Sequence, residues 1–172
     1  MQGFTGKNTS EIAHCSIINN QGIGILVQKG IRVVVYKNTI QNSSIGVALI
    51  IGSQRTIVTG NNINHNRGNG ISSDSSSTLS VFEGNTISSN ADNGIALFNA
   101  ANSNSGLSVY VNGTVKYAPG TSQDNVIIRN TILSNGGASI HMAASGTLPI
   151  AATKIIGNTI SGNAFGVRVG GE

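Results

Sequence analysis

A short segment that recurs along the whole chain constrains its fold more than any other feature. The clearest copy, residues 84–97, contains Asn-Thr-Ile, an asparagine three residues after that isoleucine, and then Gly-Ile-Ala-Leu. A period in the low twenties is typical of solenoids, in which each repeat builds one coil. The isoleucines that mark the copies follow one another at steps of 23, 23, 24, 45 and 28 residues and are Ile17, Ile40, Ile63, Ile87, Ile132 and Ile160.

Each copy contains three apolar clusters. One lies before the marker isoleucine, one is centred on it, and one follows it, as Phe82, Ile87 and Ile95 illustrate. Apolar and polar residues alternate in two of the clusters, which is the pattern of a half-buried β-strand. We therefore predict three short strands per coil and no helices, because the helical spacing of apolar residues does not recur.

Asparagine recurs at two positions of the repeat. It stands two residues before the marker isoleucine, as in Asn85, and three residues after it, as in Asn90; Cys15 and Ser43 replace it once each. Asparagine tolerates left-handed backbone and its amide bonds to turn peptides. Stacked on successive coils, these side chains are predicted to form a ladder. At the Asn position of the first coil, we expect Cys15 to be a buried, inert thiol.

This pattern resembles the right-handed parallel β-helix repeat proteins, a broad group with pectate lyases, polygalacturonases, alginate epimerases, phage tailspikes and NosD-like periplasmic proteins. The resemblance covers roughly residues 10–170. It implies an all-β, right-handed parallel β-helix of about six coils, and we expect one domain over residues 1–172. Bare ends of such a solenoid expose strand edges, so self-association through the end coils is expected unless a cap, such as an irregular one from residues 1–8, covers them.

The repeat is interrupted most strongly at its 45-residue step. Alternating residues flank Asn112-Gly113, which predicts a β-hairpin over residues 107–117. We therefore expect one coil with an insertion, residues 99–123, after its third strand, and a smaller extension at residues 144–153. Loops on a rigid scaffold are frequent places for function, so the hairpin is a candidate binding element.

Acidic residues are few and do not form the pairs that several reactions need. Glycoside hydrolysis requires two facing carboxylates, yet no two acidic residues share a repeat position on neighbouring coils. The polygalacturonase motifs, the Asp-Pro-His motif of alginate epimerases and calcium-binding Gly-Gly-x-Gly-x-Asp repeats are also missing. The histidines share no metal-binding spacing, so we expect neither a metal site nor another cofactor. The acidic residues are Glu11, Asp74, Glu83, Asp92, Asp124 and Glu172.

His141 and Arg168 are the candidate catalytic residues. Both occupy outward positions on the third strand of adjacent coils. A β-elimination on a uronide uses a base beside a cation that stabilises the enolate, and this pair has those two groups. The alternative is that they are two unrelated surface residues.

Two groups of residues are candidate ligand contacts. Arg32 and Arg55 stand at the same repeat position on consecutive coils, Lys29 lies in the same turn, and Lys116 of the hairpin projects toward this edge. An acidic polysaccharide or a phosphate would bring these like charges together, although solvated arginines are the plainer interpretation. On the hairpin, Tyr110 and Tyr117 are predicted to share a face, where they contact either a sugar or the helix body.

Composition narrows the classes of function that remain. The formal net charge is +4, charged residues are 9% of the chain, and the basic residues are scattered, so we expect no nucleic-acid partner. No 18-residue apolar run or signal peptide is visible. The single cysteine excludes an internal disulfide. Our leading hypothesis is a non-catalytic extracellular or cell-surface module that binds carbohydrate or protein. The alternatives are a polysaccharide lyase or related carbohydrate-active enzyme, a self-assembling solenoid, and an ice-binding solenoid suggested by Thr86-Ile-Ser88 and Thr159-Ile-Ser161.

Overall fold

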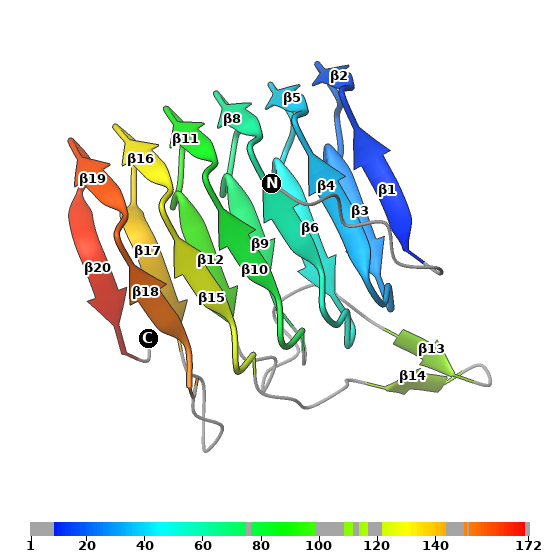
Figure 1. Cartoon of the computed structure of the whole chain (residues 1–172). Coiled ribbons are helices and arrows are strands. Elements are labelled where there is room, and N and C mark those ends of the chain that lie inside the picture. Colours follow the sequence, from blue (N-terminus) through cyan, green and yellow to red (C-terminus); the bar gives the residue numbers. More distant parts are fainter. Residues whose placement is uncertain are drawn as a thin grey trace.

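The chain forms a parallel β-helix of stacked coils, shown in Figure 1. The computed structural model describes residues 9–74, 77–98, 109–111, 114–116, 122–143, 150 and 152–170. Three sheets of six strands run along the rod, and each coil contributes one strand to each sheet. The predicted all-β solenoid of about six coils with three strands each is therefore confirmed. None of the described residues lies in a helix that could span a bilayer.

The strand order within each sheet follows the order of the coils. The first sheet contains β1 (Ser10–Ala13), β4 (Val33–Tyr36), β7 (Ile57–Thr59), β10 (Val81–Glu83), β15 (Val126–Ile128) and β18 (Lys154–Ile156). The second contains β2 (Ser16–Ile18), β5 (Thr39–Gln41), β8 (Asn62–Asn64), β11 (Thr86–Ser88), β16 (Thr131–Leu133) and β19 (Thr159–Ser161). The third contains β3 (Ile25–Gln28), β6 (Val47–Ile50), β9 (Ile71–Ser73), β12 (Ile95–Phe98), β17 (Ala138–Ala143) and β20 (Phe165–Val169).

The core is a stack of identical positions from successive coils. The marker isoleucines pair with one another in register, as Ile63 does with Ile87 and Ile87 with Ile132. Phe82, Ile87 and Leu97, one from each sheet, are fully buried in the fourth coil. Gly70 precedes the third strand because a Cβ there would lie 2.5 Å from Ile87 Cγ2. Burial of one apolar stripe from each sheet stabilises the whole rod.

Two asparagine ladders run through the corners on either side of the second sheet, as predicted. In the first ladder, the backbone N–H and Nδ2 of Asn61 both donate to Oδ1 of Asn85, at 3.0 and 2.9 Å. Nδ2 of Asn85 in turn donates to Oδ1 of Asn130 and to the carbonyl of Val58, each at 2.9 Å. Each amide thus satisfies buried peptide groups of neighbouring coils, which would otherwise be costly.

The left-handed residue of each of these corners is the residue before the asparagine. His14, Lys37 and Arg129 precede the first ladder with φ values of 56°, 51° and 53°. The tolerance of asparagine for left-handed backbone is therefore not what these ladder positions use. The reason is that the asparagine must point inward to bond along the rod, so the residue before it turns the chain.

The insertion leaves the coils in register. β10 pairs directly with β15, and β12 pairs directly with β17, across the long step of the repeat. Between them, β13 (Val109–Val111) and β14 (Thr114–Lys116) form an antiparallel hairpin in a sheet of their own. The predicted hairpin is therefore confirmed, while its predicted turn, Asn112-Gly113, lies outside the described residues.

The expected burial of Cys15 is wrong. Its thiol is exposed, and Sγ donates to the carbonyl of Ala13 at 3.3 Å. Its backbone N–H still joins the ladder by donating to Oδ1 of Asn38 at 2.9 Å. Burial at this position depends on coils at both sides, which Asn61 has, whereas Cys15 lies in the first described coil.

Candidate functional site

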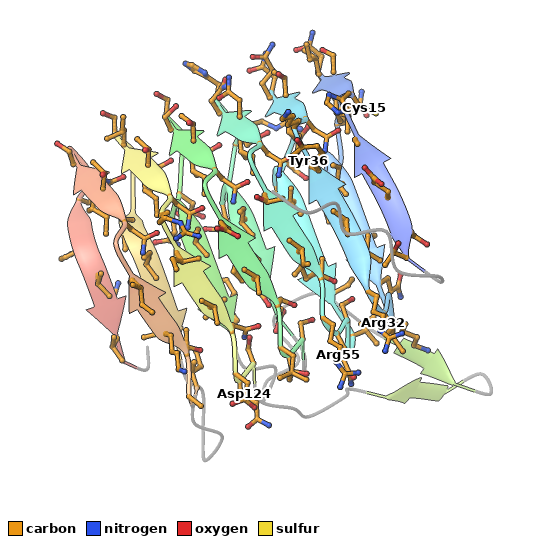
Figure 2. All side chains as sticks on the ribbon, in the orientation of Figure 1. Cys15, Arg32, Tyr36, Arg55 and Asp124 are labelled. Carbon is orange, nitrogen blue, oxygen red and sulfur yellow. The ribbon has the colours of Figure 1, made fainter. Side chains whose placement is uncertain are left out.

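A column of left-handed residues forms the corner between the third and first sheets. We call Arg32, Arg55, Leu79 and Asp124 the corner column; their φ values lie between 54° and 59°. Arg32, Arg55 and Leu79 each donate their backbone N–H to a carbonyl on the next coil, at 2.9, 3.1 and 3.2 Å, and these acceptors are Gln54, Thr78 and Gln123. The backbone therefore fixes the order of the four side chains along the rod. Figure 2 labels three of them on the same edge.

Arg32 and Arg55 are brought together as the sequence predicted. Both are exposed and lie on adjacent coils, whose backbones are about 4.8 Å apart. Among the described residues the one ion pair is between Glu83 and Arg129, at another corner. Lys29, three residues before Arg32, is also exposed and left-handed, with φ of 53°. No described carboxylate forms an ion pair with these three cations. This corner is therefore a cluster of positive charge.

Exposed apolar side chains adjoin these cations, and the sequence had not predicted a role for them. Ile31 is 59% exposed and Leu79 is 42% exposed. Ile31 lies directly before Arg32, and Leu79 follows Arg55 in the corner column. Their repeat positions could have identified them, because both stand in the same turn as the arginines. Together with the cations they make a strip that combines positive charge and exposed apolar surface.

Asp124 follows Leu79 in the corner column with the opposite charge, and Ala152, also left-handed with φ of 53°, stands at the same repeat position on the next coil. It is exposed, and Leu79 lies between it and Arg55. Two coil steps separate the backbones of Arg55 and Asp124, or roughly 10 Å. The sign of the charge therefore changes along this edge of the rod.

His141 and Arg168 are neighbours on β17 and β20, in direct register. His141 is only 5% exposed, and its ring packs edge-on against Phe98, with 6.0 Å between centroids. The Arg168 guanidinium lies 5.7 Å from the centroid of the Phe165 ring. The backbones are adjacent, but each side chain contacts a different aromatic ring.

Outward side chains of the third sheet are buried in its middle coils. Ala48, Ile50 and Ala96 are 2%, 4% and 0% exposed, although they alternate with core residues, whereas Leu26 is 47% exposed. A buried side chain offers no surface to a partner, so Ala48, Ile50 and Ala96 do not provide a surface for self-association.

The structure describes the backbone pairing of two residues of the predicted hairpin site. Tyr110 lies opposite Val115, and Lys116 lies opposite Val109. Tyr117 and the side chains of Tyr110 and Lys116 lie outside what the structure describes, so their ligand role stays a prediction.

A third tyrosine, Tyr36, was not proposed from the sequence. Its ring contacts His14 edge-on, with 5.4 Å between centroids, and Lys37 Nζ lies 4.9 Å from its centre. A tyrosine at this repeat position occurs once, so the repeat gave no indication of it. No group of three or more His, Cys, Asp or Glu side chains that could hold a metal ion occurs in the described part of the chain.

Threonines stack on the outward face of the second sheet. Thr86, Thr131 and Thr159 are direct neighbours on β11, β16 and β19. Asn62 interrupts the column on the next strand. The second outward position holds Ser88, Leu133 and Ser161, so the regular Thr-x-Thr face of ice-binding solenoids is not formed on these strands, and ice binding stays a prediction.

Comparison with solved structures places the chain beside polysaccharide epimerases of the same fold. It is 17% identical to the periplasmic alginate epimerase AlgG, with a TM-score of 0.68, and covers 38% of that protein and 94% of its own length. A mutant of AlgG gives 16% identity, a TM-score of 0.72 and the same coverage. The A-module of the mannuronan C-5 epimerase AlgE6 of Azotobacter vinelandii gives 15% identity and a TM-score of 0.66, over 95% of this chain and 48% of the module. The chain thus spans less than half of the length of these structures, and likenesses at this identity show the fold alone.

The chain also matches a family model, described as right handed beta helix region, over residues 3–106. No curated protein matches the chain. The family match includes more than half of the 172 residues. The chain therefore belongs to the right-handed β-helix family.

Proposed function

We propose that this protein is a non-catalytic extracellular β-helix module that binds an acidic polysaccharide along its corner column. One observation carries the proposal: Arg32 and Arg55 are stacked on adjacent coils, exposed, and without an ion pair to any described carboxylate. Two like charges held this close repel each other, and an anion between them removes the repulsion.

The surroundings of the arginines support a sugar as the source of that anion. Guanidinium groups bind carboxylates and sulfates through paired hydrogen bonds. The exposed side chains of Ile31 and Leu79 provide apolar contacts for the C–H faces of sugar rings. The structurally similar proteins include an alginate epimerase and a mannuronan epimerase, which supports a polyuronate as the first ligand to test.

The test is binding of the protein to alginate, with dextran as an uncharged reference, by isothermal titration calorimetry. We expect binding to alginate only, and its weakening by salt, because exposed charges are screened. The double variant Arg32→Gln/Arg55→Gln should weaken binding about tenfold.

A matched control removes two other cations from left-handed corner positions. Lys37→Gln/Arg129→Gln loses the same charge from residues with φ of 51° and 53° at a different corner. It should bind alginate like the unaltered protein. An equal loss of affinity in both double variants would mean that binding depends only on the net charge of the protein. That result would reject the corner as the site.

An enzymatic role is the second candidate, favoured by the direct pairing of His141 with Arg168. In a lyase, His141 would take the proton next to the uronate carboxyl group while Arg168 stabilised the charge that develops there. The glycosidic C–O bond would then break, and the departing sugar oxygen would take up a proton and leave as a hydroxyl group. Because His141 is buried, the enzymatic role is the weaker candidate of the two. Release of unsaturated uronates, followed by ultraviolet absorbance, would establish it. Full activity in a His141→Ala/Arg168→Ala variant would remove this pair from the mechanism.

A further inference from the structure

The corner column presents three kinds of surface in a fixed order. Arg32 and Arg55 come first, Leu79 follows with 42% of its surface exposed, and the exposed Asp124 comes next, before the uncharged Ala152 of the last described coil. Figure 2 shows Arg32, Arg55 and Asp124 along one edge of the rod. The order is fixed by the backbone hydrogen bonds between coils, so a ligand lying along this edge meets these surfaces in sequence.

Asp124 is close enough to act on the same ligand. Two coil steps, roughly 10 Å, separate it from Arg55. This is about one Debye length at 0.1 M salt, so its charge is only partly screened at the cationic end. Asp124 makes no ion pair with a described cation; the ion pair between described residues joins Arg129 to Glu83 at the neighbouring corner. Its charge is therefore available to a ligand that lies along this part of the column.

We infer that Asp124 selects the kind of acidic polysaccharide, and this inference rests on the proposed function. An extended sugar chain advances by about one sugar per coil. Acidic sugars then lie against Arg32 and Arg55, and a sugar ring contacts Leu79. The next sugar meets a carboxylate, which accepts hydrogen bonds from neutral hydroxyl groups and repels a second carboxylate. The preferred ligand is thus a heteropolysaccharide in which short acidic blocks are followed by neutral sugars, and a uniformly charged polyuronate is a poorer one.

The substitution Asp124→Asn tests this selection. Asparagine keeps the shape and tolerates left-handed backbone, so the corner should be retained. We expect the variant to bind a long polyuronate roughly two- to fivefold more tightly than the unaltered protein. Binding of an acidic disaccharide, which is too short to reach Asp124, should stay unchanged. At 1 M salt, where the Debye length is about 3 Å, the gain should disappear.

A matched control is Asp92→Asn, which removes the charge of an exposed aspartate outside the corner column. It should leave the affinity for the long polyuronate as it is. If the unaltered protein binds no acidic saccharide, the proposed function itself fails. If it binds and Asp124→Asn gives no gain, or the same gain as Asp92→Asn, the selection by Asp124 is overturned while the binding function stands.

Discussion

At the scale of single residues, the asparagine side chains connect neighbouring coils. Oδ1 of Asn85 accepts two hydrogen bonds from Asn61, and its Nδ2 donates to Val58 and Asn130. All of these groups are buried, so water cannot replace a missing partner.

Asn85→Ala should therefore lower the free energy of unfolding by about 2–5 kcal/mol, because it leaves several buried peptide and amide groups unsatisfied. Chemical denaturation measures the loss. Asn62→Ala, on the exposed face of β8, is the control and should cost less than about 1 kcal/mol. Similar losses in both variants would contradict the role of the ladder.

Cys15 provides a second residue-scale prediction. Because its thiol is exposed, an alkylating reagent should modify it completely in the folded protein, at a rate close to that in denaturant. Mass spectrometry over a time course checks this. Protection of Cys15 until the protein unfolds would show that the N-terminal coil is covered.

The sequence predicted the ladders because the same residue type recurs at one repeat position. The left-handed residues were not predicted, although glycine precedes the asparagine in three coils, because the other coils have His14, Lys37 and Arg129 there, which share no property that requires such a backbone. The burial of His141 was also unforeseen, because its outward position in the strand predicts exposure.

At the scale of elements, Arg67 connects coils that are not adjacent. It lies in the turn between β8 and β9, and its guanidinium donates to the carbonyls of Gln21 at 2.7 Å, Asn20 at 3.2 Å and Asn42 at 3.4 Å. It thus holds the turns of the first and second coils against that of the third.

Arg67→Ala should increase amide hydrogen exchange in β1, β2 and β3, because the outermost coil loses these bonds. The last coils should exchange as before. Arg67→Lys is the informative control. The lysine ammonium group keeps the charge but lacks the planar guanidinium that donates to three carbonyls. Full protection in the lysine variant would mean that charge alone is sufficient.

The elements themselves were largely predictable. The repeat fixed the register of all three sheets, and Asn112-Gly113 identified the hairpin, because both depend on local pattern. The hydrogen bonds of Arg67 were not predictable, because arginine does not recur at its position of the repeat. Its partners also come from two other coils.

At the scale of the whole molecule, the last described coil differs from the others. β18, β19 and β20 are the outermost strands of their sheets. Val167 and Val169, which continue the core stripe, are 46% and 69% exposed. Such edges pair readily with another chain.

We therefore expect this chain to associate as its concentration rises, with an increase in mass measured by light scattering. Val169→Lys should reduce the association, because a charge would be buried in the contact. Leu79→Lys, an exposed leucine at the corner of an interior coil, should leave it unchanged. A constant monomeric mass across the concentration range would contradict the prediction.

The direct pairing of β12 with β17 has a consequence for how such a protein diversifies. Because β10 pairs with β15 and β12 with β17 across the insertion, the insertion between β12 and β15 is a place where the sequence can change without altering the pairing of the coils. Shortening, lengthening or replacing it changes what the rod displays and leaves the rod itself intact. Natural selection can thus change the displayed insertion and the supporting coils separately.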